Sequence, residues 1–245
     1  MKLKLAFLLL CLLFPFSAYA AGLPTITVGI GEATDPGEVS TALQILVVLT
    51  ILSVAPAILL MTTGFTRIVI VLSFMRQALG TQSAPSNQIV IGLALFLTFF
   101  VMAPVFNQIN EQALQPYLDK QISQEKALEE ALQPMRKFMF SQVGEKDLQL
   151  LVDISKSPQP ENQADISMMT LMPAFMLSEL KRAFQMGFLL FVPFLMVDMI
   201  VASILMSMGM MMLPPIIVSL PFKILLFVLV DGWSLVIGSL VKSFG

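Results

Sequence analysis

Residues 42–61 read ALQILVVLTILSVAPAILLM, a run of twenty residues without a charged side chain. A helix needs about 20 apolar residues to cross the hydrocarbon core of a bilayer, so this run predicts a membrane-spanning helix. Three further apolar runs follow, at 89–106, 184–208 and 216–241. The third contains Asp198, and the fourth contains Lys223 and Asp231. The pattern predicts an all-α, multi-spanning membrane protein built of helical hairpins.

The overall composition agrees with this fold class. Hydrophobic residues make up 57% of the 245 residues, and charged residues make up 12%. Ordinary globular domains carry about 25% charged residues, so much of this chain must be solvated by lipid or by protein. The 14 basic and 16 acidic side chains give a net charge of −2. Because there is no basic surplus to neutralise phosphates, we expect no nucleic-acid partner.

Residues 1–20 predict a secretory signal peptide. Two lysines precede an apolar stretch over 5–16, and a small-x-small site ends at Ala20. This order of regions is typical of a cleaved signal, so we expect cleavage between Ala20 and Ala21. The alternative is an uncleaved first membrane helix, which the shortness of the apolar stretch disfavours.

The distribution of charge predicts which side of the membrane each segment occupies. Segment 21–41 carries acids and no base, whereas connector 62–88 carries two arginines and no acid. Short cytoplasmic loops are enriched in lysine and arginine. We therefore expect 62–88 to be cytoplasmic and 21–41 periplasmic, with the first membrane hairpin over 42–106. Segment 107–183 is then periplasmic, and the second membrane hairpin covers 184–245.

The predicted periplasmic segment has the composition of a soluble helical domain. It holds 11 acids and 8 bases. Apolar residues recur at helical spacing in two stripes, at 109, 114, 117 and 118 and at 128, 131, 132, 135 and 139. We expect its last helix to begin near Thr170, with Pro173 tolerated in the first turn, and to continue into the third span.

Prolines predict that the membrane helices are kinked. They lie inside or beside every apolar run, at Pro56, Pro104, Pro193, Pro214, Pro215 and Pro221. An interior proline removes one backbone hydrogen bond, and in lipid the freed carbonyl needs a partner in a neighbouring helix or a water-lined cavity. The pattern favours a tightly associated complex, although prolines are also commoner in membrane helices generally.

Charges inside the last two runs must be paired or hydrated, because a lone charge there costs several kcal/mol. With a tight hairpin near 210–215, Asp198 and Lys223 lie about four residues apart across it, or about 6 Å. Asp231 lies about 12 Å along the helix from Lys223, which is too far for a direct pair. Two interpretations stay open: an ion pair that fixes the register of the hairpin, and a proton relay.

The hairpin turn is rich in methionine. Twelve of the 18 methionines fall between residues 168 and 212, and Met210, Met211 and Met212 are consecutive. Methionine is unbranched and polarizable, so a ring of such side chains from several protomers can close a pore and give way to a polypeptide. The alternative is ordinary apolar packing at a hairpin tip.

The sequence offers little for catalysis. There is no histidine, and the single Cys11 lies in the predicted signal peptide. Thiol, triad and metal chemistry therefore lack their usual groups, and we expect no metal or other cofactor. An intramembrane aspartyl protease needs two close carboxylates, but the Tyr-Asp and Gly-x-Gly-Asp motifs of that class are absent around Asp198 and Asp231. We expect the chain not to be an enzyme.

Several segments together resemble the FliP family of flagellar export proteins. They include MGMMM at 208–212, SLPFK at 219–223 and LVDGW at 229–233, with further matches at 76–80, 83–88, 92–98 and 178–181. The resemblance covers nearly the whole chain after the predicted signal peptide. Related proteins of virulence-type injectisomes share these motifs, and the signal peptide and the periplasmic segment favour the flagellar branch.

The resemblance implies a subunit of a type III export gate in the bacterial inner membrane, at the flagellar basal body. It implies a pentamer-like homo-oligomer that assembles with FliQ and FliR, works with FlhA and FlhB, and passes unfolded flagellar proteins. It also implies that Met210, Met211 and Met212 form a gasket, and that the hairpins can sit above the bilayer plane. The alternatives are a proton-coupled transporter using Asp198, Lys223 and Asp231, and an assembly scaffold without a pore.

Overall fold

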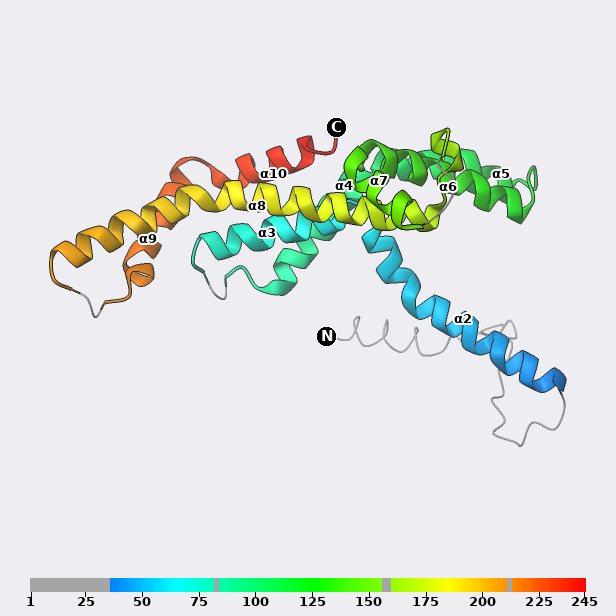
Figure 1. Ribbon diagram of the computed structural model, residues 1–245, viewed down its shortest axis with the longest axis horizontal. Helices are drawn as coiled ribbons and strands as arrows, with labels where there is room; N and C mark the ends of the chain where they lie inside the picture. Colours follow the sequence, from blue (N-terminus) through cyan, green and yellow to red (C-terminus); the bar gives the residue numbers. More distant parts are fainter. Residues whose placement is uncertain (1–35, 82–83, 156–159, 211–212) are drawn as a thin grey trace, which may run out of the picture. The chain divides into compact units, whose positions relative to one another are not determined.

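Every regular element that the structure describes is a helix, which confirms the predicted all-α fold (Figure 1). The computed structural model describes residues 36–81, 84–155, 160–210 and 213–245. The predicted signal peptide with its cleavage site at Ala20 and Ala21 lies outside the described residues, as do Met211 and Met212.

The described helices differ widely in length. In chain order they are α2 (Pro36–Met61), α3 (Phe65–Ala78), α4 (Asn87–Ile109), the π-helix η1 (Asn110–Leu114), α5 (Gln115–Leu118), α6 (Gln124–Gln142), α7 (Glu145–Ser155), the 3-10 turn η2 (Gln163–Asp165), α8 (Met168–Ser207), α9 (Pro215–Leu229) and α10 (Gly232–Lys242).

Within the part of the chain that the structure describes, three helical stretches are long and apolar enough to cross a membrane: Leu43–Met61, Asn87–Leu118 and Met168–Ser207. The pair α9 and α10 can supply a fourth span, but the two helices are bent by 65° at their junction. The predicted fourth span over 216–241 is therefore made of two helices with a sharp bend between them. The chain turns at Asp231, whose backbone is left-handed, with φ of 50°.

The chain divides into two units, residues 1–50 and 51–245. In the first unit, the described side chains of α2 include Leu43, Leu46 and Val48, each more than half exposed. An apolar helix with no buried face of its own requires lipid or another protein as its solvent. The features below belong to the second unit.

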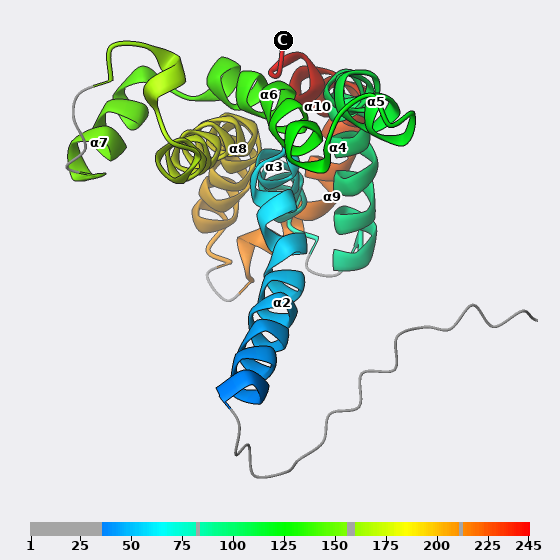
Figure 2. The same ribbon diagram turned by 90° about the vertical axis from the view of Figure 1, so that its right-hand side faces the viewer.

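Helix α3 lies at the centre of the second unit. Its side chains Ile68, Val71, Leu72 and Met75 are at most 1% exposed. They pack in one core with apolar residues of α4, α8, α9 and α10, and Figure 2 shows α3 lying among these helices. The predicted connector 62–88 is thus largely a core helix, because its apolar residues recur at helical spacing and form a buried stripe.

Helix α8 runs without interruption for 40 residues alongside α3. Its N-cap Ser167 accepts a hydrogen bond from the Thr170 backbone N–H at 3.2 Å, which confirms the predicted start near Thr170 and the continuation into the third apolar run. A Cβ at Gly187 would lie 2.7 Å from the Phe74 ring. The absence of that atom lets α3 approach α8 closely, as small residues do between membrane helices.

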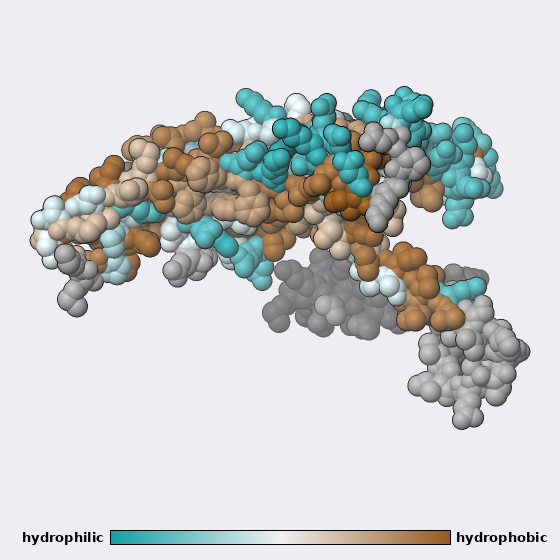
Figure 3. All heavy atoms as spheres, viewed as in Figure 1, coloured by the Kyte–Doolittle hydropathy of each residue, from teal (hydrophilic) through white to brown (hydrophobic). Residues whose placement is uncertain are grey.

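The surface of the second unit changes character along its length. Hydrophilic residues gather over α5, α6 and α7, and hydrophobic residues cover most of the hairpin of α8 and α9 (Figure 3). A smaller core under the polar end contains Met139, Ile166, Leu171 and Phe175. The polar end is helical, whereas the hairpin exposes an apolar surface that requires lipid or partner chains.

Candidate functional site

Arg67 of α3 and Glu179 of α8 form a fully buried ion pair, each side chain being 0% exposed. The Arg67 Nε donates to Glu179 Oε2 at 2.9 Å, and Nη2 donates to Oε1 of the same carboxylate. Two parallel bonds of this kind make a bidentate pair with a fixed geometry. Removing one partner from such a buried pair costs about 3–5 kcal/mol, because the other charge stays buried.

The other N–H groups of Arg67 bind elements far away in the sequence. Nη2 donates to Gln142 Oε1 at 2.9 Å, and Nη1 donates to the backbone oxygen and Oγ of Ser243 at 2.8 and 2.9 Å. The guanidinium also lies 3.9 Å from the ring centre of Phe244. We call Arg67, Gln142, Glu179, Ser243 and Phe244 the Arg67 cluster. Since all five N–H donors have acceptors, the cluster binds α3, α6, α8 and the end of α10 together.

The Arg67 cluster bears on the predicted topology. The distribution of charge predicts a cytoplasmic 62–88 and a periplasmic 107–183, which would separate Arg67 from Glu179 by a membrane. Their direct contact shows that these two positions lie on the same side. At least one of the two assignments must therefore change. The two arginines of 62–88 suggested a cytoplasmic loop, but one of them is a buried partner of an acid.

Asp198 of α8 and Lys223 of α9 form a second ion pair, as their positions across the hairpin predicted. Lys223 Nζ donates to Asp198 Oδ2 at 2.5 Å and to the backbone oxygen of Ala78 at 3.2 Å. Ser219 Oγ donates to Asp198 Oδ1 at 2.5 Å. We call Ala78, Asp198, Ser219 and Lys223 the Lys223 cluster. It joins α8 and α9 to the last residue of α3.

The arrangement of the Lys223 cluster favours the structural interpretation of these charges. The Lys223 side chain is 4% exposed and that of Asp198 is 23% exposed. The ammonium lies at the C-terminal end of α3, where the helix dipole stabilises a positive charge. Both carboxylate oxygens have donors, and the ammonium has two acceptors. A pair bonded in this way fixes the register of the hairpin, whereas a proton relay would need a further exchangeable group nearby.

The sequence pattern predicts the pairing of Asp198 with Lys223 but not the contacts of the residues around them. Ser219 precedes Lys223 by one helical turn, so the spacing alone could have placed it on the same face. Arg67 and Glu179 are separated by 112 positions. No local pattern indicates that pairing, and it could be recognised only after the packing of α3 against α8 was known.

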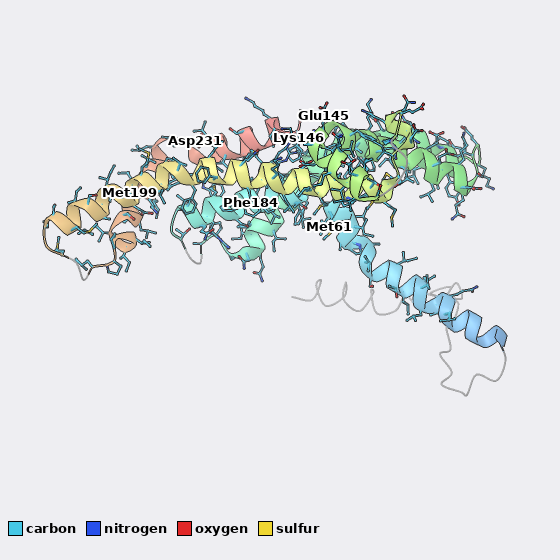
Figure 4. The ribbon with its side chains drawn as sticks, viewed as in Figure 1. Met61, Glu145, Lys146, Phe184, Met199 and Asp231 are labelled. Carbon is cyan, nitrogen blue, oxygen red and sulfur yellow. The ribbon has the colours of Figure 1, made fainter. Side chains whose placement is uncertain are left out.

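Asp231 stands apart from both clusters, as predicted. It lies at the turn between α9 and α10 (Figure 4), where it is exposed and makes no capping hydrogen bond with its side chain. The following Gly232 is needed for the turn, because a Cβ there would lie 2.3 Å from the Phe227 ring. The Phe227 ring also contacts the Trp233 ring edge-on, with 5.6 Å between the two ring centres.

The segment 208–212, which contains four methionines and which we call the methionine turn, follows the end of α8 at Ser207. Gly209 has a φ of +76°, a conformation that suits glycine and ends the helix. Met208 is 66% exposed and Met210 is half-buried. Because Met211 and Met212 lie outside the described residues, the gasket stays a prediction. Among the residues described on either side of these gaps, no group of three or more histidine, cysteine, aspartate or glutamate side chains could hold a metal ion.

Long apolar helices, a core of packed hairpins and ion pairs buried between them define the class: an all-helical integral membrane protein. The FliP family model matches residues 48–240, and the chain belongs to that family. This confirms the resemblance found in the sequence.

Three relatives illustrate the similarity, and each is a flagellar biosynthetic protein FliP. The one from Bacillus subtilis is 56% identical over 217 residues, covering 89% of this chain and 98% of that protein. The one from Caulobacter vibrioides is 51% identical, covering 96% of this chain and 86% of that protein. The one from Aquifex aeolicus is 46% identical over the full length of both chains.

Proposed function

We propose that the chain is a non-enzymatic subunit of the flagellar type III export gate. The match of residues 48–240 to the FliP family carries this proposal, together with relatives whose names place them in flagellar biosynthesis. The structure supports it through the hairpin of α8 and α9, which carries an exposed apolar surface and ends in a methionine turn. An exposed apolar surface of this kind must be covered by lipid or other subunits, which fits a helical hairpin in the wall of a channel built from several chains.

The proposed channel is a pentamer-like ring of this chain, assembled with FliQ and FliR in the inner membrane. It works beside FlhA and FlhB and passes unfolded flagellar proteins. In the closed state, Met210, Met211 and Met212 from several copies form the gasket. Exposed apolar side chains near the turn, such as Ile204, Met206 and Ile217, would face lipid or neighbouring subunits.

We further propose that the second unit does not cross the bilayer as independent spans. The Arg67 cluster ties α3 to α8 and the Lys223 cluster ties the end of α3 to the hairpin, so these helices act as one body. That supports hairpins held beside each other in a complex, which can sit above the bilayer plane. Segment 107–183 stays periplasmic in this proposal, and Arg67 then lies on the periplasmic side too.

The proposal is tested by deleting the gene in its own bacterium and restoring it in trans. Loss of motility, loss of flagellar proteins from the medium and recovery of both with the intact gene are the expected results. A deletion strain that still exports flagellar proteins would overturn the proposal. A tagged chain should copurify with the other export proteins, and single cysteines placed in 107–183 should react with an impermeant thiol reagent applied from outside.

The rival function, a proton-coupled transporter, is less well supported by the geometry. Asp198 and Lys223 satisfy each other, and Asp231 belongs to neither cluster. Replacement of Asp198 by Asn separates the two functions: a relay loses transport with the complex intact, whereas a structural pair loses the assembled complex. An injectisome subunit is the remaining alternative, and export of flagellar rather than virulence proteins distinguishes it.

A further inference from the structure

Asp231 differs from the other acids of this part of the chain, because its carboxylate has no partner side chain among the described residues. The other acids of α8, α9 and α10 have partners: Glu179 binds Arg67 and Asp198 binds Lys223. Asp231 has no ion pair and no side-chain hydrogen bond with any of the residues that the structure describes. Its carboxylate is exposed at the turn between α9 and α10 (Figure 4).

The backbone at this position does not require an acid. Asp231 adopts φ 50° and ψ 53°, the left-handed conformation. Glycine adopts it without strain, and asparagine tolerates it as well as aspartate does. The close approach to the Phe227 ring is made possible by Gly232 instead. As the N-cap of α10, the negative charge is stabilised weakly by the helix dipole, but it has no bond to a partner side chain among the described residues.

The surroundings of this charge are apolar. Val228, Leu229 and Val230, which precede Asp231, are 68%, 75% and 51% exposed, and Leu235 on α10 is 57% exposed. An exposed apolar surface of this kind is covered by lipid or by another chain. Once it is covered, a lone carboxylate costs a few kcal/mol unless a cation or water compensates it.

We propose that Val228, Leu229, Val230 and Asp231 form a docking surface for an apolar helix of another chain that carries one lysine or arginine. The apolar side chains supply the contact area. The ion pair with Asp231 fixes the position of the partner helix along its own axis. A partner without the basic residue would leave the carboxylate uncompensated, so the charge also selects the partner. This inference rests on the proposed function as a subunit of a larger complex.

Charge complementarity favours a different chain over a second copy as the partner. Lys242 is the basic residue of α10, and it lies eleven positions from Asp231, or about 16 Å along the helix. The other basic side chains of α8 and α9 already have partners: Lys181 pairs with Asp147, Arg182 donates to Gln142 and Lys223 binds Asp198. Lys242 is the remaining base of these helices, and it lies at the opposite end of α10 from Asp231.

The charge requirement is tested with Asp231→Asn and Asp231→Lys in the full chain. Asparagine and lysine adopt the left-handed backbone conformation of this turn more readily than a β-branched residue does. Asparagine also keeps the shape of the aspartate side chain. The matched controls are Asp153→Asn and Asp153→Lys at an exposed acid of α7. The measurement is the amount of complex that copurifies with the tagged chain, relative to the amount of tagged chain in the membrane.

Loss of one partner of an interface ion pair lowers affinity by about tenfold or more, so we expect that decrease for Asp231→Asn and a larger one for Asp231→Lys. The Asp153 variants should assemble like the wild type. Replacing a lysine or arginine by glutamate in the partner should restore assembly of Asp231→Lys. Wild-type levels of complex with both Asp231 variants would overturn the proposal.

A second measurement identifies the partner directly. The variant Leu229→Cys should form a disulfide with a cysteine scanned along an apolar helix of another chain, next to the basic residue of that helix. A disulfide only between two copies of this chain would overturn the choice of partner. If the wild-type chain copurifies with no export protein, the proposed function itself fails, and this outcome is distinct from normal assembly of the Asp231 variants.

Discussion

Replacing Lys223 by methionine tests whether the Lys223 cluster stabilises the fold. Methionine has a similar length and no charge, so the substitution removes the ammonium with little change in volume. Asp198 then keeps only the hydrogen bond from Ser219, and the carbonyl of Ala78 loses its donor. Breaking a buried pair costs about 3–5 kcal/mol. Because the Asp198 side chain is 23% exposed, water can reach it, and we expect a loss near the lower end, about 3 kcal/mol.

The chain provides its own probe for this measurement. Its single tryptophan, Trp233, contacts Phe227, which lies one helical turn after Lys223. Unfolding in detergent can therefore be followed by tryptophan fluorescence as denaturant is added. A loss of about 3 kcal/mol should lower the midpoint clearly while the slope of the transition stays the same.

The double variant Asp198→Leu with Lys223→Met gives the sharper result. Replacing both members of a buried pair by apolar residues is often neutral, so the double variant should recover most of the stability lost by Lys223→Met alone. A single variant as stable as the wild type would refute the reasoning. So would a double variant whose loss equals the sum of the two single losses, because the charges would then not be coupled.

Two further substitutions test the packing, and a third tests the predicted gasket. Gly187→Val should push on the Phe74 ring, separate α3 from α8 and lower the free energy of unfolding by about 2 kcal/mol or more. The control Gly92→Val has open space around it and should cost under about 1 kcal/mol in the same denaturation assay. Phe244→Ala should remove the ring beneath the Arg67 guanidinium and cost about 2 kcal/mol, and an unchanged melting temperature would contradict this contribution. Changing 210–212 to alanine should raise ion leakage through the membrane, and unchanged leakage would exclude the gasket.

The sequence was sufficient for features that depend on local pattern. Apolar runs of about twenty residues predicted the long helices, since chain length and hydropathy alone decide whether a helix can cross a bilayer. The start of α8 is close to the expected Thr170, but it lies at Met168, so Pro173 falls beyond the first turn where it was expected; the N-cap Ser167 was not predicted. Counting residues across one tight turn was enough to pair Asp198 with Lys223.

Features that depend on tertiary packing were not accessible in this way. Arg67 was interpreted as a mark of the cytoplasmic side because arginine in a short loop usually has that meaning. Its burial against Glu179 depends on how α3 packs with α8, which no nearby residue encodes. The break at Asp231 was missed for another reason: hydropathy remains high through 216–241, and the one local signal was the Asp231-Gly232 dipeptide.

The length of α8 converts small movements into large ones. From Glu179, held in the Arg67 cluster, to Ser207 at the end of the helix is 28 residues, or about 42 Å. Because the Lys223 cluster holds α8 to α3 and α9, these helices move as one body, and a tilt of about 5° of that body about Glu179 would carry Ser207 sideways by about 4 Å. Between those points, Pro193 is the one residue that interrupts the backbone hydrogen bonds. In the proposed gate, a small rotation that starts among α5, α6 and α7 would widen or narrow the pore near Ser207, at the other end of α8.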